Sequence, residues 1–322
     1  MIDLFSGIGG IRLAFEQHGV ECVASSEIDK YARITYFQNF SDIPLGDISM
    51  ITSEDLPSFD ILAGGFPCQP FSMGGLRKGF EDTRGTLFFQ VARLLKSCQP
   101  KAFFLENVQG LVNHDKGKTL GVIEETLREV GYDFQWKVMD SCHYGVPQSR
   151  KRWYCIGFRK DLKIHFNSTT GPNGIMFHFP EPFDLRYRLC DILQSDVGDE
   201  YKVSDMAMNH IKKHLFEKQL LLPIVIDNML AYEIRPSRCA FRYDGISPCL
   251  TAKMGTGGNN VPVLVKEQRK LTERECLRIM GYPDSFSIAK NSSHSYKQIG
   301  NSVVVPVVSL LAKEIVNVLN QI

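Results

Sequence analysis

The chain has 322 residues, of which 43% are hydrophobic and 23% charged, and its formal net charge at pH 7 is +1. These values are ordinary for a soluble globular protein, and the length suits one large domain with a smaller one. A globally basic nucleic-acid binder is excluded, so any nucleic-acid site must be a local patch.

The nine cysteines are scattered along the chain without a C-x-x-C spacing. This pattern argues against a zinc site and a disulfide framework, and it favours a reducing compartment. The first expected strand begins at Ile2 and no apolar run reaches the length of a membrane span. We therefore expect a soluble cytoplasmic protein with no leader and no membrane segment.

Residues 1–160 alternate short apolar runs with stretches of helical periodicity, which is typical of an α/β fold with a parallel sheet. The expected strands are 2–5, 21–25, 61–63, 102–105 and 153–157. The expected helices are 11–18, 30–39, 87–97 and 119–130.

The composition changes near 166–173, which is rich in Asn, Ser, Thr, Gly and Pro and predicts a linker. Residues 176–296 are less periodic and rich in loops, and 303–322 is again apolar at helical spacing. We expect a catalytic domain of residues 1–175 plus 297–322, and a second domain of residues 176–296.

A glycine-rich turn at 6–10 joins the first expected strand to the first expected helix. Gly7 and Gly9 let the backbone approach a ligand closely, and the helix start offers free N–H groups. Glu27 follows 20 residues after Gly7, where an acid can bind two ribose hydroxyls. The third glycine of the dinucleotide fingerprint is replaced by Arg12, so NAD and S-adenosylmethionine (AdoMet) both remain open.

Residues 64–72, GGFPCQPFS, present a cysteine at a stiff turn. The paired glycines permit a tight exit from a strand, and Pro67 fixes the backbone just before Cys68. A nucleophile would need such a position. Together with the glycine-rich turn, this segment suggests covalent catalysis with a cofactor.

These two segments and four later ones closely resemble the DNA cytosine-5 methyltransferases of bacterial restriction–modification systems. The matching segments are DLFSGIGG at 3–10, GGFPCQPFS at 64–72, ENV at 106–108, QSRKR at 148–152, the block at 274–286 and QIGNSV at 298–303. They follow the family's order from Asp3 to Val305, with the middle third weakly matched. The resemblance implies an AdoMet-dependent methyltransferase: a Rossmann-like α/β fold, with a mixed sheet, helices on both faces and a smaller loop-rich target-recognition domain.

The resemblance also implies four catalytic residues. Cys68 would add to C6 of cytosine, which makes C5 nucleophilic, and the thiolate is the attacking form. Glu106 ends an apolar strand and would hydrogen-bond N3 and the exocyclic amine. Arg152 would contact O2, where negative charge develops, and Arg150 would support the same pocket.

The cofactor residues implied by the family lie mostly in the first domain. Phe5 would pack on the adenine and Glu27 would bind the ribose, while Ile28 stands where the family usually has an aromatic residue. The full implied set is Phe5, Gly7, Gly9, Glu27, Ile28, Asp47, Ile48, Pro67, Leu87, Asn301, Ser302 and Val303. The products would be 5-methylcytosine and S-adenosylhomocysteine, and we expect no metal.

The target cytosine must leave the duplex to reach a buried cysteine. Residues 70–86 have the composition of a lid, and the second domain would read the flanking bases. The expected DNA-binding residues are Ser72, Arg84, Arg242, Thr251 and Gly257. The family's Thr-Leu pair is replaced by Cys249-Leu250, with Thr251 next, so the hydroxyl contact is either shifted or absent.

The partner implied is double-stranded DNA, with a cognate restriction endonuclease as a functional partner, and we expect a monomer associated with the nucleoid. The alternatives are a tRNA cytosine-5 methyltransferase and a non-catalytic DNA-binding relative. The tRNA branch typically carries a Cys-Phe-Thr signature that this sequence lacks. An exocyclic-amine methyltransferase and an NAD-dependent oxidoreductase fit the motifs less well.

Overall fold

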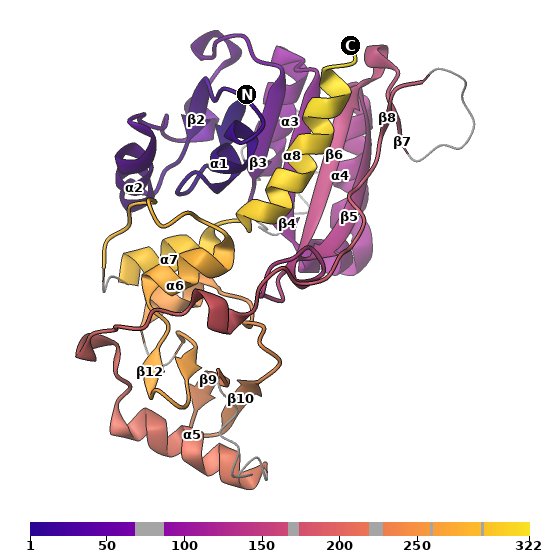
Figure 1. Ribbon diagram of the computed structural model, residues 1–322. Coiled ribbons are helices and arrows are strands. Elements are labelled where there is room, and N and C mark those ends of the chain that lie inside the picture. Colours follow the sequence, from indigo (N-terminus) through magenta and orange to yellow (C-terminus); the bar gives the residue numbers. More distant parts are fainter. Residues whose placement is uncertain (68–86, 167–173, 219–227, 258–259, 291–292) are drawn as a thin grey trace. The chain divides into compact units, whose positions relative to one another are not determined.

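The computed structural model describes residues 1–67, 87–166, 174–218, 228–257, 260–290 and 293–322. The chain forms two compact units (Figure 1). Unit 1 contains Met1–Met139, Lys151–Glu181 and Val307–Ile322, and unit 2 contains Asp140–Arg150 and Pro182–Pro306. This division differs from the expected one, because residues 140–150 and 297–306 are grouped with unit 2 and residues 176–181 with unit 1.

Unit 1 is built on a six-stranded mixed sheet in the order β2-β1-β3-β4-β6-β5 (Figure 1). The strands are β1 Ile2–Leu4, β2 Ala24–Ser26, β3 Ile61–Gly65, β4 Ala102–Val108, β5 Tyr132–Asp140 and β6 Lys151–Arg159. Strands β2, β1, β3 and β4 pair in parallel, and β6 pairs antiparallel to β4. The expected strands did not include β5, whose side chains are mostly half-buried.

Helices cover both faces of this sheet, as the sequence predicted. They are α1 Gly10–Glu16, α2 Lys30–Phe40, α3 Leu87–Cys98, α4 Lys118–Glu129 and α8 Val305–Leu319. Side chains alternate along a strand, so Phe103 and Leu105 join the core with α3 and α4 while Phe104 faces Phe15 of α1. Asp29 starts α2, because its carboxylate accepts the backbone N–H groups of the first turn.

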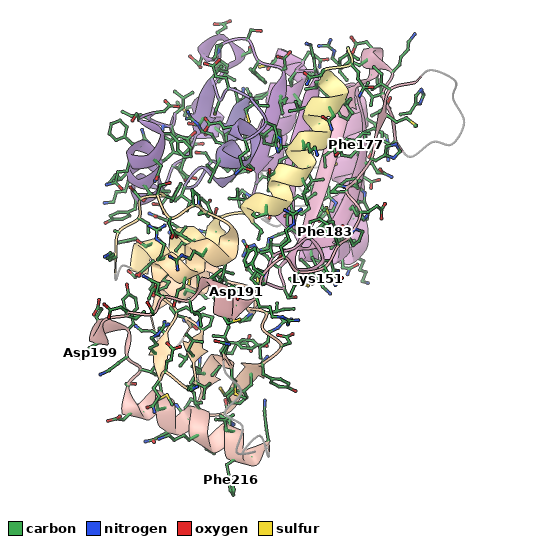
Figure 2. The ribbon with its side chains drawn as sticks, viewed as in Figure 1. Lys151, Phe177, Phe183, Asp191, Asp199 and Phe216 are labelled. Atoms are coloured by element: carbon green, nitrogen blue, oxygen red, sulfur yellow. The ribbon has the colours of Figure 1, made fainter. Side chains whose placement is uncertain are left out.

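Two short strands lie on either side of the expected linker. They are β7 His165–Phe166 and β8 Met176–Phe177, which pair in parallel within unit 1. Phe177, labelled in Figure 2, packs against Phe158 of β6 with a ring-centroid distance of 5.9 Å. The ends of the linker are therefore anchored to unit 1, while residues 167–173 lie outside the described part of the chain.

Unit 2 contains a four-stranded sheet in the order β10-β9-β11-β12. The elements are α5 Asp205–Glu217, β9 Leu230–Arg235, β10 Arg238–Arg242, β11 Val263–Leu264, β12 Arg269–Lys270, α6 Glu273–Met280 and α7 Ser293–Asn301. Met208, Ile211 and Leu215 of α5 pack on the sheet, and Ser204 caps the helix by accepting the Ala207 N–H. Phe216 extends from the other end of α5 and is 71% exposed (Figure 2).

The stretch Ser293–Leu319 is long and apolar enough to cross a membrane by length and composition alone. However, 56% of its most apolar window is buried inside the protein. A core helix of a soluble protein has the same properties, so this stretch is weak evidence for a membrane span.

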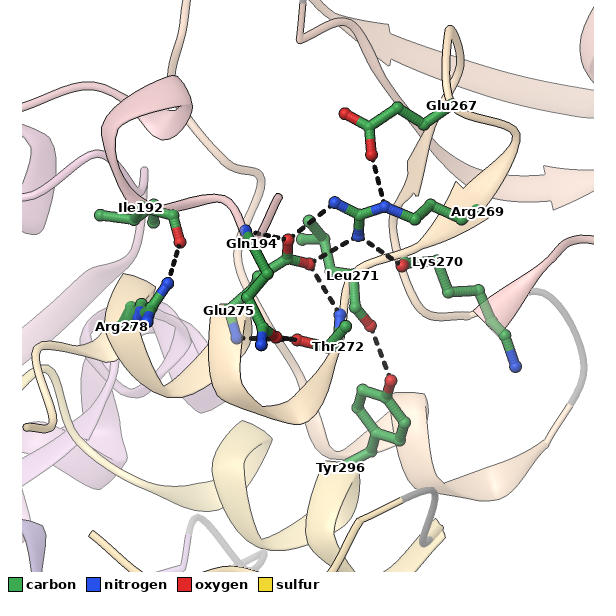
Figure 3. A network of polar contacts seen from close by, with 10 residues as sticks. All are labelled: Ile192, Gln194, Glu267, Arg269, Lys270, Leu271, Thr272, Glu275, Arg278 and Tyr296. Atoms are coloured by element: carbon green, nitrogen blue, oxygen red, sulfur yellow. Dashed lines mark hydrogen bonds and ion pairs between the residues drawn. The ribbon is translucent and has the colours of Figure 1, made fainter. Parts of the chain in front are cut away.

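A buried charged network joins α6 to β12 in unit 2 (Figure 3). Arg269 donates to both carboxylate oxygens of Glu275 at 2.8 Å, and Glu275 is fully buried. The same carboxylate accepts the backbone N–H of Thr272, whose hydroxyl accepts the Glu275 N–H, which forms a capping box. Gln194 donates its backbone N–H to Glu275 at 2.9 Å and so ties a distant loop to this helix.

A second buried carboxylate, Asp3, lies in β1 under the glycine-rich turn. Neither oxygen has a hydrogen-bond partner of standard geometry among the described residues, and the nearby hydroxyls of Ser6 and Ser25 have none either. Burial raises the Asp3 pKa to about 8, because the nearby backbone and guanidinium of Arg12 offset only part of the desolvation. The negative side chains of Glu27 and Glu16 raise this pKa further.

Replacing Arg269 by Met should destabilise unit 2 by about 3–5 kcal/mol, because it leaves the Glu275 carboxylate buried without its cation. Urea unfolding measures this loss. Lys202→Met is the matched control, since Lys202 pairs with Asp199 at 2.8 Å on an exposed surface. Equal effects of the two substitutions would contradict the role given to the buried pair.

Asp3→Asn should change how stability depends on pH. The folded pKa is raised, so between about pH 4 and pH 8 the folded protein keeps a proton that the unfolded chain has lost. This difference lowers wild-type stability by about 1.4 kcal/mol per pH unit across that window. Urea unfolding at several pH values should therefore show an advantage of Asp3→Asn that grows up to pH 8 and then levels off. A pH-independent difference between Asp3→Asn and the wild type would contradict the prediction.

Candidate active site

The parallel strands of unit 1 bring three of the predicted segments to one edge of the sheet. Leu4 of β1 pairs with Gly64 of β3, and Gly65 pairs with Glu106 of β4. The turn after β1, the exit of β3 and the acid of β4 therefore share the carboxyl edge, where open α/β sheets bind ligands.

The turn after β1 has a backbone that few side chains tolerate. Phe5 has φ 56°, Gly7 has φ 54° and Gly9 has φ 87°, all in the left-handed region. Gly9 also starts α1, and a Cβ there would overlap the Phe40 ring. Space is open around Gly7, since a Cβ there would meet no atom within 4 Å.

Glu27 is held in place by two backbone groups. Its Oε2 accepts the Gly7 N–H at 2.8 Å and its Oε1 accepts the Asp29 N–H at 2.7 Å. Each carboxylate oxygen keeps one further lone pair for a hydroxyl donor. Ile28 is 71% exposed beside it, so an acid and an apolar surface are available together.

The predicted adenine contacts lie on a short 3₁₀ helix, η1 Ile48–Met50. Asp47 caps it through the Ser49 N–H and is exposed, whereas the Ile48 side chain is only 2% exposed and packs in the core. Ile48 can therefore offer a ligand its backbone only. Arg93 of α3 donates to the Ile48 carbonyl at 3.0 Å and so fixes this loop. No motif in the sequence pointed to Arg93.

Glu106 and Arg152 form a partly buried ion pair at the same edge. The Arg152 Nε lies 3.0 Å from Glu106 Oε1, and the two side chains are 13% and 12% exposed. Arg152 pairs with Val108 across β4 and β6, so its side chain is the diagonal neighbour of Glu106. A Cβ at position 65 would lie 3.1 Å from Glu106 Oε2, so glycine leaves room for this carboxylate.

Asn107 fixes the exit of β3. Its buried amide donates to the Phe66 carbonyl at 2.9 Å, immediately before Pro67 and Cys68. The sequence contained a signal for it, since Asn107 is the middle residue of the ENV segment, but only Glu106 was predicted. Pro67 itself is exposed, and Leu87 begins α3 against the core. Cys68, Ser72 and Arg84 lie outside the described residues.

The two arginines of QSRKR lie in different surroundings. Arg152 meets Glu106 in unit 1, whereas Arg150 belongs to unit 2 and is 3% exposed. The Arg150 guanidinium donates to the backbone carbonyls of Leu250, Gly300 and Ser302. The structure therefore gives Arg150 partners other than those of Arg152.

The remaining predicted residues are all in unit 2. Asn301 is exposed while Ser302 and Val303 are buried, and Thr251 is exposed just before the 3₁₀ helix η10 Ala252–Thr256. Arg242 binds the Asp244 carboxylate through Nε and Nη2, each at 2.9 Å. Gly257 has φ 76° and open space around it.

The described residues contain no cluster of three or more His, Cys, Asp or Glu side chains suited to a metal ion. Three features of unit 1 fit AdoMet. The glycine turn is open, the Glu27 carboxylate is held where it can bind ribose hydroxyls, and the apolar side chain of Ile28 is exposed beside it. Residues 5–9, 27–28 and 47–48 would hold it.

Comparison with known proteins identifies the family of this chain. A model of the family described as C-5 cytosine-specific DNA methylase matches residues 1–317. The type II methyltransferase M.HhaI of Haemophilus parahaemolyticus is 42% identical over 99% of this chain and 94% of its own length. The type II methyltransferase M.HpaII of Haemophilus parainfluenzae is 41% identical over 100% of this chain and 90% of its own.

The fold is also similar to solved structures. A DNMT2 mutant of Spodoptera frugiperda matches with a TM-score of 0.71 at 24% identity, covering 98% of both chains. The Dnmt2 methyltransferase of S. pombe matches with a TM-score of 0.70 at 22% identity, covering 99% of this chain and 98% of its own. These two likenesses concern the fold alone. Sequence identity over nearly the whole length is the decisive finding, and by it the chain belongs to the C-5 cytosine-specific DNA methylase family.

Proposed function

We propose that this DNA (cytosine-5) methyltransferase acts at a specific sequence, on a cytosine turned out of the duplex, through a covalent bond between Cys68 and C6. The observation that carries the proposal is the Glu106–Arg152 pair at the carboxyl edge of β4. It lies next to the strand whose exit leads to Cys68. The family supplies the reaction class, and the proposal assigns the roles.

Glu106 and Arg152 together would bind the edge of a cytosine that carries N3 and O2. Glu106, a carboxylate paired with Arg152 when no base is bound, would take up a proton and hydrogen-bond N3 of the cytosine, and Arg152 would stabilise the negative charge that develops at O2. Because the ion pair is mostly shielded from water, both groups are already oriented before the base arrives.

Cys68 would attack as the thiolate: its Sγ would form a bond to C6, the C5=C6 π bond would break, and the displaced electron pair would make C5 nucleophilic. AdoMet supplies the methyl group that C5 takes. Loss of the C5 proton to a base and breaking of the Sγ–C6 bond then restore the aromatic ring and free Cys68. Asn107 supports this chemistry by fixing the backbone that leads to the cysteine.

Glu27, with Phe5 and Ile28, would hold the ribose and adenine of the cofactor, and Asp47 with the Ile48 backbone would complete the adenine site. Asn301, Ser302 and Val303 are the further cofactor-binding residues of the proposal. Supporting this proposal, the Glu27 carboxylate is already fixed by two backbone N–H groups.

Unit 2 would read the DNA sequence. Arg242, Thr251 and Gly257 are the proposed contacts there, with Ser72 and Arg84 from the segment after Cys68. The protein would act as a monomer in the cytoplasm, on the nucleoid, and would protect DNA from a cognate restriction endonuclease. The similarity to two type II methyltransferases, at 42% and 41% identity, supports that role.

Cys68→Ser should abolish methylation, because a hydroxyl is too weakly acidic to add to C6. Plasmid DNA from a host without cytosine methylation, carrying either the wild-type or the variant gene, would be examined by bisulfite sequencing. We expect protected cytosines within one short repeated sequence for the wild type and none for the variant. The exposed Cys190→Ser is the matched control and should methylate normally.

Methylation by Cys68→Ser would overturn the covalent mechanism. If bisulfite converted every cytosine of the plasmid although the wild-type protein was soluble, the proposal that DNA is the substrate would be wrong. Bisulfite sequencing of tRNA from the same cells would then test the tRNA alternative. Binding of S-adenosylhomocysteine by Cys68→Ser, measured by calorimetry, should equal that of the wild type.

Arg152→Lys should lower the single-turnover methylation rate by about 100-fold or more, since removal of one transition-state donor has effects of that size. Rapid-quench kinetics at saturating DNA and AdoMet measure it. Arg128→Lys is the control, because Arg128 pairs with Glu124 on an exposed helix surface. A rate within threefold of wild type for Arg152→Lys would contradict the role of Arg152.

A further inference from the structure

Arg150 makes an unusual set of contacts for a residue of the QSRKR segment. Its Nη1 donates to the Leu250 carbonyl at 2.5 Å, and its Nη2 donates to the Gly300 carbonyl at 3.1 Å and the Ser302 carbonyl at 2.6 Å. The Cys249 Sγ lies 3.5 Å from Nη1. One buried guanidinium therefore joins two backbone segments that are about 50 residues apart in the sequence.

These contacts supply what the end of α7 lacks. The last carbonyls of a helix have no partner within it, and they carry the negative end of the helix dipole. The last turn of α7 contains no basic residue, and the Gly300 carbonyl belongs to that turn. Arg150 provides both the donors and the positive charge at this helix end.

The backbones of α7 and η10 also touch directly. A Cβ added at Gly300 would fall on the backbone of Thr251 and Ala252, and a Cβ added at Gly255 would fall on the carbonyl of Ser293. Only glycine permits this approach at the two positions. At Gly300 the two backbones therefore pack without a side chain between them, and Gly255 lies against the Ser293 carbonyl and the Cβ of Lys297.

A hydroxyl pair completes the joint. The Tyr282 hydroxyl bonds the Ser302 hydroxyl, and both residues are buried. Tyr282 is part of the 274–286 block that resembles the family. Ser302 is thus held through its carbonyl by Arg150 and through its side chain by Tyr282.

We infer that Arg150 is a positioning residue that locks α7 to η10, and thereby holds the cofactor-side residues 301–303 and the DNA-side residue Thr251 in one arrangement. The inference rests on the proposed function for the roles of those residues. The inference gives the two arginines different roles: Arg152 acts on the base, and Arg150 acts through the backbone carbonyls that it binds.

The contacts explain why Arg150 is unsuited to the base itself. Turning the guanidinium toward a ligand would leave three carbonyls of unit 2 without this donor in a region where Arg150 is 3% exposed. Buried carbonyls without partners are strongly disfavoured. A lysine in its place would keep the charge but could not donate in the fixed fork that spans both segments.

The test compares Arg150→Lys with Arg274→Lys in the full-length protein. Arg274 is a matched control, because it also donates to two backbone carbonyls of unit 2, those of Pro283 and Phe286. We expect Arg150→Lys to weaken binding of both S-adenosylhomocysteine and target DNA by about tenfold, the effect of losing one charged hydrogen bond. The single-turnover rate at saturation should stay within about threefold of wild type, in contrast to Arg152→Lys.

Hydrogen exchange distinguishes local loosening of the contact between α7 and η10 from a general loss of stability. Peptides covering residues 249–252 and 298–303 should exchange faster in Arg150→Lys, while peptides from β9 and α5 should not change. If Arg150→Lys does not fold, Tyr282→Phe loosens the same joint more mildly and should show the same pattern with smaller effects.

Three outcomes would overturn the inference. One is a large fall in the saturated single-turnover rate with both affinities unchanged, which would place Arg150 at the base. The second is an affinity change for only one of the two ligands. The third is unchanged exchange at residues 298–303 in both variants. Binding of S-adenosylhomocysteine and hydrogen exchange need no methylation, so failure of the proposed function is recognised separately.

Discussion

Parallel pairing of β1, β3 and β4 is the constraint on which the unit 1 site depends. Because these strands run in the same direction, the glycine turn, the exit toward Cys68 and Glu106 must meet at one edge, although they are far apart in the sequence. Strand β6 runs the other way, so its first residues, including Arg152, reach the same edge. The site therefore follows from strand direction more than from any single contact.

Elements that form strongly apolar or periodic runs could be predicted from the sequence. Strands β1, β3, β4 and β6 and helices α1 to α4 lie within a few residues of their expected ranges. Strand β5 was missed although residues 132–138, YDFQWKV, alternate apolar and polar side chains, so its signal was present in the sequence. The expected strand at 21–25 is shorter and shifted, since only Ala24–Ser26 pairs with β1.

The predicted site residues were found by motif, and motifs do not report tertiary partners. Glu106 and Arg152 meet as neighbours across two strands, which the sequence alone could suggest once both strands were placed. Arg150 could not be distinguished from Arg152, because its partners at Leu250 and Ser302 are set by packing of distant segments. Arg93 is a similar case, since it acts on a backbone carbonyl that no pattern marks, whereas Asn107 lies in the matched ENV segment.

The close packing of α7 on η10 also bears on how new DNA specificities could arise in this scaffold. A recombination that exchanged the segment around Thr251 without α7 would place a foreign backbone against Gly300, where no side chain fits between the two elements. Exchange of the hairpin β9–β10 with α5, which have their own apolar core, would leave that joint intact. Within unit 2, the β9–β10 hairpin and α5 can therefore be exchanged without disturbing this joint. The segment around Thr251 and α7 must be exchanged together.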